Sequence, residues 1–246
     1  MKCVSIENEV KLFLSKENTY SIDYENRIIR IHKTKKDTEV LFYGGVLESW
    51  DIRITTNNFS LDPITEFSDK RISGCLNFHD LEFKIVTLKA KNTYCEDAIH
   101  LLRTTGNINQ VIIDGAAKDG LDSDFSKLSF NQIFIRNSGN DCADFSGGQY
   151  QIEELKVFNC EDKGLSVGEK SKILVSSFEA ERTHTALGVK DSSVAKFLDG
   201  SVKNSIYCLS VYRKKQEYSG ARDEIDKEAC RNNKVYQQEG SIIDWI

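Results

Sequence analysis

The amino-acid sequence predicts an all-β fold, a single-domain right-handed parallel β-helix with coils of about 22 residues. Three sets of positions spaced 22 residues apart support this prediction, because each set keeps one character over six successive units. The first set is apolar at all six positions, the second is apolar at five of six, and the third consists of small residues throughout. They are Ile99, Leu121, Ala143, Leu165, Leu187 and Leu209; Leu101, Ser123, Phe145, Val167, Val189 and Val211; and Ala98, Gly120, Cys142, Gly164, Ala186 and Cys208. Apolar positions two apart are typical of a β-strand, so each coil is expected to add the same strand to a stack.

The periodic pattern divides the chain into three parts. Residues 74–220 follow the 22-residue step and are predicted to form the regular β-helix. Residues 1–73 contain strand-like runs such as 27–31 that do not follow it, which indicates irregular N-terminal coils or a cap over the first sheet edge. Residues 221–246 are predicted to form a distorted C-terminal coil or a cap.

The composition excludes several classes of protein. The net charge is -5 and the pI about 5.5, so the basic surface typical of a nucleic-acid-binding protein is absent. No stretch approaches the ~18 apolar residues of a membrane-spanning helix. Glu7 and Glu9 interrupt the N-terminal segment before a signal-peptide core could form. We therefore expect a cytoplasmic protein, which could be part of a larger chain or complex.

The cysteine content leads to a prediction about redox state. The chain has 7 cysteines, and none of them has the spacing of a zinc site. Because the number is odd and no secretory signal is recognised, we expect reduced, mostly buried thiols. Cys208 and Cys230 are 22 residues apart and could stack, but a disulfide between them is not expected in a reducing compartment.

A row of outward carboxylates follows from the inward positions of the repeat. If the apolar positions face the core, Asp122 and Asp124 face solvent on one strand, ~7 Å apart. One coil later Asp144 falls on the position of Asp122, and one coil earlier the same position holds His100. Carboxylates stacked about 5 Å apart repel each other, so at least one should have a raised pKa unless a cation screens it.

A second polar row lies where each of these strands starts, and it includes Asp119, Asp141 and Lys163. Asp is common at tight corners, where it bonds to backbone groups, so a structural role explains Asp119 and Asp141 as well as a functional one does. Lys163 could serve only to neutralise Asp141. The acidic row as a whole could also be no more than a device for solubility.

The carboxylates suggest two kinds of chemistry. A protonated carboxyl beside an ionised one can perform general acid/base catalysis on glycosides. A carboxylate cluster on a rigid sheet can also hold Ca²⁺, for which Asp122, Asp124 and Asp144 are the candidate ligands. The candidate catalytic residues are Asp122, Asp124, Asp144, Lys163 and His100, with Lys163 or His100 as the base in a lyase or epimerase. The candidate substrate-binding residues are Asp119, Asp141, Lys190 and Tyr212.

Three segments carry a family likeness. Residues 119–126, 140–147 and 162–169 resemble coils of the right-handed parallel β-helix repeat superfamily, which includes pectate lyases, polygalacturonases and mannuronan C5-epimerases. The likeness covers about residues 74–220. The Asn-Thr-Asp and His-Gly motifs of polygalacturonases and the Asp-Pro-His-Asp motif of the epimerases are missing. The resemblance therefore implies a β-helix that faces carbohydrate, with no particular reaction attached.

Two classes of function remain open at this point. The first is an enzyme that acts on an acidic surface or capsular polysaccharide as a lyase, epimerase or hydrolase. For a hydrolase, the spacing of Asp122 and Asp124 is compatible with the ~6.5–9.5 Å of inverting glycosidases. The second is a non-catalytic glycan-binding or assembly domain of a polysaccharide-biosynthesis protein. A purely structural solenoid is a third possibility.

Overall fold

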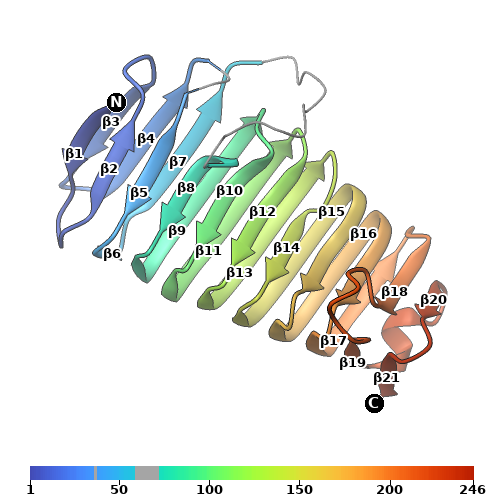
Figure 1. Ribbon diagram of the computed structural model, residues 1–246. Coiled ribbons are helices and arrows are strands. Elements are labelled where there is room, and N and C mark those ends of the chain that lie inside the picture. The colour runs from blue at the N-terminus through green and yellow to red at the C-terminus, as the bar shows by residue number, and fades with distance from the viewer. Residues whose placement is uncertain (36–37, 59–71) are drawn as a thin grey trace.

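The computed structural model describes residues 1–35, 38–58 and 72–246, which form about nine turns of a β-solenoid. Figure 1 shows the strands stacked side by side from the N-terminus at one end to the C-terminus at the other. Strands of successive coils pair in parallel, and the coil length is about 22 residues, so the predicted fold class is confirmed. Segment 59–71, which belongs to the predicted N-terminal part and contains Pro63, lies outside the described residues.

Two rows of strands run along the solenoid. The first row consists of β8 (Gly74–His79), β10 (Asp97–Leu102), β12 (Asp119–Asp124), β14 (Ala143–Ser146), the last parts of β15 (Gln149–Gly168) and β16 (Lys172–Lys190), β18 (Tyr207–Tyr212) and β20 (Lys234–Gln237). The second row consists of β9 (Glu82–Thr93), β11 (Thr105–Ala116), β13 (Lys127–Ser138), the first parts of β15 and β16, β17 (Val194–Lys203), β19 (Arg222–Ile225) and β21 (Ile242–Trp245). We call the outer surface of the first row the acidic face.

The first strands form an end of different topology. They are β1 (Lys2–Ser5), β2 (Lys11–Leu14), β3 (Thr19–Asp23), β4 (Ile28–Lys33), β5 (Val40–Tyr43), β6 (Val46–Glu48) and β7 (Asp51–Thr56). Strand β2 pairs antiparallel with both β1 and β5, and β3 pairs antiparallel with β4. The parallel stack is continuous with them through β4–β7 and β5–β8. At the other end, the 3-10 helix η1 (Lys227–Cys230) interrupts the last coil.

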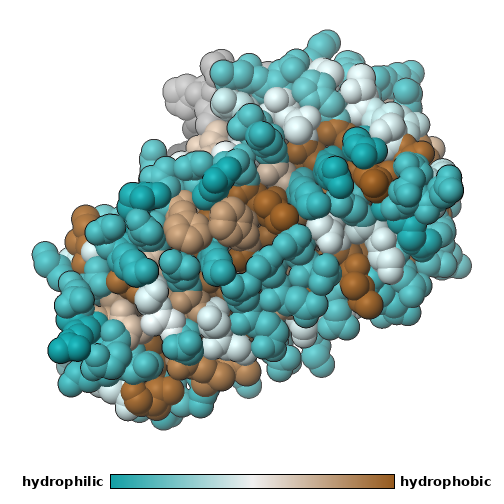
Figure 2. Space-filling model, turned by 180° about the vertical axis from the view of Figure 1, so that it is seen from behind, coloured by the Kyte–Doolittle hydropathy of each residue, from teal (hydrophilic) through white to brown (hydrophobic). Residues whose placement is uncertain are grey.

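The predicted apolar rows are the core. Leu121 pairs with Ala143, and Leu187 with Leu209, each pair being one coil apart and fully buried. The small row is confirmed as well: a Cβ at Gly120 would lie 2.5 Å from the carbonyl oxygen of Cys142 in the next coil. A larger side chain there would push the coils apart. The outer surface seen from behind is mostly hydrophilic, with apolar patches between (Figure 2).

The prediction of reduced cysteines is wrong. The structure contains the disulfides Cys75–Cys95, Cys142–Cys160 and Cys208–Cys230, and Cys3 is free and exposed. The sequence separations of 20, 18 and 22 residues are close to one coil, so each pair lies on neighbouring coils with Cα atoms 5.3 to 5.5 Å apart. The cytoplasmic location, which was expected because no secretory signal is recognised, stays a prediction.

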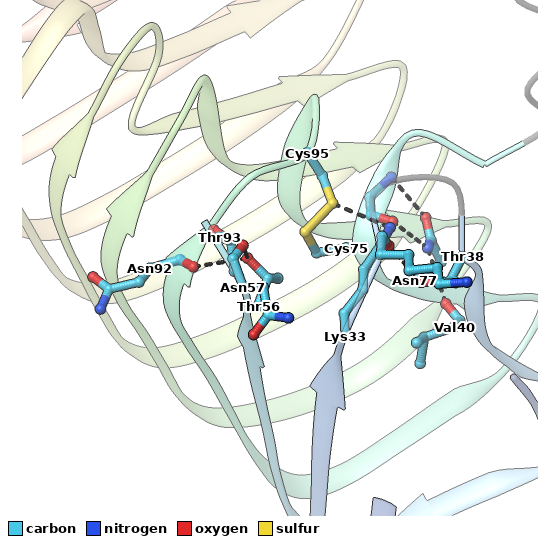
Figure 3. The surroundings of a disulfide bond; sticks show 12 residues. Lys33, Thr38, Val40, Thr56, Asn57, Cys75, Asn77, Asn92, Thr93 and Cys95 are labelled. Atoms are coloured by element: carbon cyan, nitrogen blue, oxygen red, sulfur yellow. Dashed lines mark hydrogen bonds between the residues drawn. A yellow bond between two sulfur atoms is a disulfide. The ribbon is translucent and has the colours of Figure 1, made fainter. Parts of the chain in front are cut away.

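The disulfide nearest the N-terminal end lies beside a polar cluster (Figure 3). Cys75 and Cys95 connect β8 to the turn before β10. Close by, the fully buried Asn77 donates hydrogen bonds to the carbonyl oxygens of Val40 (2.9 Å) and Gly74 (2.7 Å). The bond to Val40 ties the start of the regular coils to the N-terminal strand β5, and the disulfide ties β8 to the next coil.

Candidate functional site

The predicted row of outward polar residues exists on the acidic face. His100 on β10 pairs with Asp122 on β12, Asp122 with Asp144 on β14, and Asp144 with Ser166 on β15. In each pair the two residues lie side by side on neighbouring parallel strands of successive coils. Asp122 and Asp144 are partly exposed and alternate with buried neighbours on their strands, whereas His100 (7% exposed) and Ser166 (0%) are buried. Of these four side chains, only the two carboxyl groups are open to solvent.

Three side chains of this row and its neighbour converge. The Nε2 atom of His100 lies 3.4 Å from Oδ2 of Asp124 and 3.9 Å from Oδ2 of Asp122. One ligand atom from each of the three groups lies within 4.8 Å of the others. The His100 side chain is 9% exposed, whereas those of Asp122 and Asp124 are 23% and 28% exposed, so the carboxyl groups can meet a ligand from solvent. All three are among the candidate catalytic residues predicted from the sequence, and we refer to this candidate site as the catalytic cluster.

The second ring nitrogen of His100 is also held in place. Nδ1 of His100 lies 3.3 Å from Oγ of Ser73. The ring of His79 packs edge-on against that of His100, with centroids 5.6 Å apart. Burial and the neighbouring His100 lower the pKa of His79 to about 4, so His79 is neutral near pH 7. The contacts with Ser73 and His79 hold the imidazole in place, and its Nε2 faces the carboxyl groups of Asp122 and Asp124.

Burial and mutual repulsion favour the protonated form of the carboxyls below this cluster. Burial, followed by the charges of Asp97 and Asp124, raises the pKa of Asp122 to about 10. Burial raises the pKa of Asp97 to about 7, against the hydrogen bond from Ser73. Asp97 is 2% exposed and pairs with Asp119 one coil on. A cluster of this kind can hold a proton on one carboxyl at neutral pH while another stays ionised.

Asp119 and Asp141 lie in the second row and bond to the following coil. Oδ1 of Asp119 accepts hydrogen bonds from the amide nitrogen of Asp141 (2.8 Å) and from Nδ2 of Asn140 (2.6 Å). Oδ1 of Asp141 accepts one from the amide nitrogen of Lys163 (2.9 Å). Burial raises the pKa of Asp141 to about 6 against the attraction of Lys163. Both side chains therefore have a structural use at the corner, and substrate contact by them stays a prediction.

Lys163 lies beside two carboxylates. Its Nζ is 3.4 Å from Oδ1 of Asp141 and also pairs with Asp162. Burial opposes its charge, but the attraction of Asp141 and Asp162 outweighs burial and raises the pKa of Lys163. A lysine held in its cationic form is a poor proton acceptor. The geometry thus favours Lys163 as a positive charge near a substrate over the predicted base.

Asp144 faces away from the catalytic cluster. Its Oδ2 is 3.5 Å from Nζ of Lys190, which also donates to Oγ of Ser166 at 2.5 Å. The charges of Lys163 and Lys190 act on Tyr212 on the same face, although burial raises the pKa of its hydroxyl overall. Lys190, Tyr212 and Lys163 therefore extend the face beyond the carboxyls toward the C-terminal coils.

The donor set for a cation differs from the predicted one. Within the described residues, the side chains close enough to share one ion are His100, Asp122 and Asp124, while Asp144 pairs with Lys190. Ca²⁺ prefers about 6–8 oxygen ligands, and an imidazole with two carboxylates suits transition metals better. The calcium site of Asp122, Asp124 and Asp144 stays a prediction, and Asp144 would have to leave Lys190 to take part in it.

Sequence reasoning missed a neighbouring basic pocket. It lies at the corners that follow the strands of the acidic face and is lined by residues that include Arg103, Phe125, Lys127, Lys170 and Lys172. Their spacing of about one coil is visible in the sequence. The alternation of inward and outward residues applies to the strands, however, and does not identify the side chains at the corners. Phe125, which comes directly after Asp124, was the available signal.

Comparison with models of known protein families, with curated proteins and with solved structures finds no match. The assignment to a β-solenoid therefore rests on the coordinates and on the repeat itself.

Proposed function

We propose that the protein cleaves glycosidic bonds in an acidic polysaccharide that lies along the acidic face. The observation that carries this proposal is the convergence of two partly exposed carboxyl groups, Asp122 and Asp124, on the buried imidazole of His100. Two carboxyls flanking a scissile bond are the usual apparatus of glycoside hydrolysis. The resemblance to polysaccharide-acting β-helices points to the same class of substrate.

The two carboxyls have different environments, which assigns their roles. Asp122 has the raised pKa and would donate its proton to the oxygen of the leaving sugar. Asp124, oriented by His100 at 3.4 Å, would attack the anomeric carbon as a carboxylate and form a covalent glycosyl ester. Asp122, now deprotonated, would take a proton from the water that attacks this ester, which releases the sugar, frees Asp124 and restores the acid form of Asp122. One oxygen of each carboxyl group lies within 4.8 Å of the other, and this close approach supports the shorter spacing of retaining enzymes (~5–5.5 Å). We therefore propose a retaining mechanism in place of the inverting one considered from the sequence.

The rest of the face suits a long chain. Its negative groups would meet the exposed Lys127 and Lys172 beside the cluster, because Lys163 and Lys190 already pair with carboxylates. Lys163, Lys190 and Tyr212 continue the surface over the coils that follow the catalytic cluster. A solenoid presents such groups at a regular spacing of ~4.8 Å per coil, which supports an extended ligand. Disulfides persist mainly in oxidising compartments, and there the protein could meet an extracellular polymer.

The proposal is tested by incubating the protein with a panel of uronic-acid polysaccharides and measuring new reducing ends. Asp122→Asn and Asp124→Asn should each lower the rate by about 10²–10⁴-fold. Asp114→Asn is the matched control, because Asp114 pairs with Arg136 at 2.6 Å on the second row of strands, away from the cluster.

Other results would assign another function. Unsaturated sugar ends would indicate a lyase, and changed stereochemistry without cleavage an epimerase. Binding without turnover would favour the glycan-binding domain. Loss of cleavage in a chelator, restored by a divalent cation, would mean that the carboxyls act as metal ligands, and the acid/nucleophile roles would then be wrong.

A further inference from the structure

The basic pocket beside the catalytic cluster has no role in the bond-breaking step. It has a volume of about 420 Å³, within the usual range of ligand pockets. Its lining contains four cationic side chains, Arg103, Lys127, Lys170 and Lys172, and no carboxylate. The lining comes from four successive corners of the solenoid, and three of these corners carry the cations, so the coil repeat concentrates the positive charge.

Two of these cations are uncompensated. Arg103 pairs with Asp80 at 2.7 Å, and Nζ of Lys170 lies 5.7 Å from the ring centroid of Tyr218. Lys127 and Lys172 are exposed, and within the described part of the chain neither forms an ion pair. Their charge is therefore available to an anionic ligand.

An exposed aromatic ring forms one wall of the pocket. Phe125 is 60% exposed and has φ of 50°, a left-handed conformation that a bulky residue rarely adopts. Its ring lies against the corner at Gly147, where a Cβ would be only 2.5 Å from Cδ1 of Phe125. Glycine at that corner thus makes room for the ring to lie along the surface. A flat ring of this kind can stack on the apolar face of a sugar.

The pocket adjoins the catalytic cluster directly. Asp124 is the last residue of β12, and Phe125, Ser126 and Lys127 continue the chain into the pocket. A saccharide whose linkage lies over Asp122 and Asp124 would place a neighbouring sugar over Phe125.

From this geometry we propose that the pocket binds an anionic sugar unit of the glycan, next to the bond over the catalytic cluster. Phe125 stacks on the sugar ring, and Lys127 and Lys172 bind its carboxylate. The inference takes the identity of the ligand, an acidic glycan, from the proposed function. It makes a claim about binding and none about catalysis.

The test measures binding without turnover, in an Asp122→Asn background. The probes are tetrasaccharides of galacturonate, mannuronate and glucuronate, each paired with its neutral methyl ester, in calorimetric titrations. Lys127→Gln/Lys172→Gln should weaken binding of at least one acidic probe by about tenfold or more and leave its ester unchanged. Phe125→Ala should weaken both members of that pair.

The matched control is Lys16→Gln/Lys203→Gln, which removes the same charge from exposed lysines that do not line the pocket. It should leave every affinity unchanged. The proposal is overturned if no acidic probe binds, if the Lys127/Lys172 variant binds them normally, or if inorganic phosphate at equal concentration displaces the probe as well as a second saccharide does.

Failure of the proposed function looks different. If the wild-type protein cleaves none of these glycans but the binding pattern holds, the catalytic proposal fails and the subsite stands. If cleavage occurs but the Lys127/Lys172 variant binds normally, the subsite fails and the catalytic proposal stands.

Discussion

His100 and Asp124 are 24 residues apart in the sequence, yet Nε2 of His100 lies 3.4 Å from Oδ2 of Asp124. The contact is diagonal, since the direct partner of His100 in the sheet is Asp122. One imidazole therefore contacts both carboxyls that extend from β12. The orientation of the carboxyl pair depends on a residue of the preceding coil.

His100→Gln should lower the rate of glycan cleavage by about 10–10²-fold with little change in glycan affinity, because it removes the group that orients Asp124. The measurement is kcat and KM on the best polysaccharide of the panel, with the pH profile of kcat. His184→Gln is the control, because His184 packs against Tyr207 (centroids 5.7 Å apart) in later coils. Equal losses in the two variants would contradict a positioning role for His100.

Asp122→Asn should separate stability from activity. Burial and the neighbouring carboxyls of Asp97, Asp124 and Asp144 raise the pKa of Asp122 to about 10, so at pH 8 the folded protein holds a proton there that the unfolded chain has released. An amide of the same shape is neutral in both states and avoids the free-energy cost of binding that proton. We expect the free energy of unfolding at pH 8 to rise by on the order of 1 kcal/mol, while cleavage is lost. Urea unfolding of both proteins gives this difference. A destabilised Asp122→Asn variant would show that the carboxyl contributes to the fold.

The stability of the protein should fall as the pH rises above about 4. Burial raises the pKa of Asp97 to about 7 and that of Asp223 well above its usual value. Such groups bind a proton more tightly in the folded state, so the stability they contribute is complete at low pH. It is lost as the pH rises through their folded pKa values.

Carboxyls with lowered pKa values, such as Asp51 and Asp114, act in the opposite direction below about pH 4. The maximum of the melting temperature is therefore expected at mildly acidic pH. Asp223→Asn should make the decline toward pH 8 shallower, because it removes one of the raised groups. An unchanged slope in a pH series of melting curves would refute this assignment.

The repeat made most of the fold predictable. Because one residue step of 22 recurs, pairings such as Asp122 with Asp144 follow from counting, and the structure confirms them. The N-terminal strands could not be predicted in this way. Some of their pairs, such as β2 with β5, are antiparallel. Their parallel pairs, such as β4 with β7 and β5 with β8, are separated by different numbers of residues, so these strands leave no single period.

For the candidate site, the sequence predicts which residues lie on neighbouring strands, but not which side chains contact each other. Counting placed Asp144 beside Asp122, but the side chain of Lys190 reaches it from two coils further on. Long side chains cross between coils, and no backbone period encodes their direction. The odd number of cysteines does not indicate the disulfides. The signal for them in the sequence is the spacing of each pair by nearly one coil.

Gly120, in the row of small residues, should not tolerate a side chain. In Gly120→Ala the new Cβ would lie 2.5 Å from the backbone oxygen of Cys142, so the coils must separate. We expect a loss of about 1–3 kcal/mol in the free energy of unfolding. Gly188→Ala is the control on the same row of strands. Its Cβ would come closest to the flexible Lys163 side chain, at 2.9 Å, and would lie 3.7 Å from the backbone oxygen of Leu165, an ordinary contact. Chemical denaturation should show a clearly larger loss for Gly120→Ala.

Reduction of the disulfides should loosen the stack of coils. Each bond closes a loop of about one coil, and in the chain-entropy model a loop of this size contributes ~3 kcal/mol by restricting the unfolded chain. Reductant should therefore lower the midpoint of urea unfolding substantially, and Cys142→Ala/Cys160→Ala should reproduce part of the loss.

Cys3→Ser is the matched control for the disulfides, because Cys3 is exposed and unpaired, and it should leave the midpoint unchanged. Without reductant, the native wild-type protein should react with one equivalent of thiol reagent, and Cys3→Ser with none. Titration of several thiols in the untreated protein would contradict the three bonds. It would also restore the reduced state that the odd cysteine count suggests.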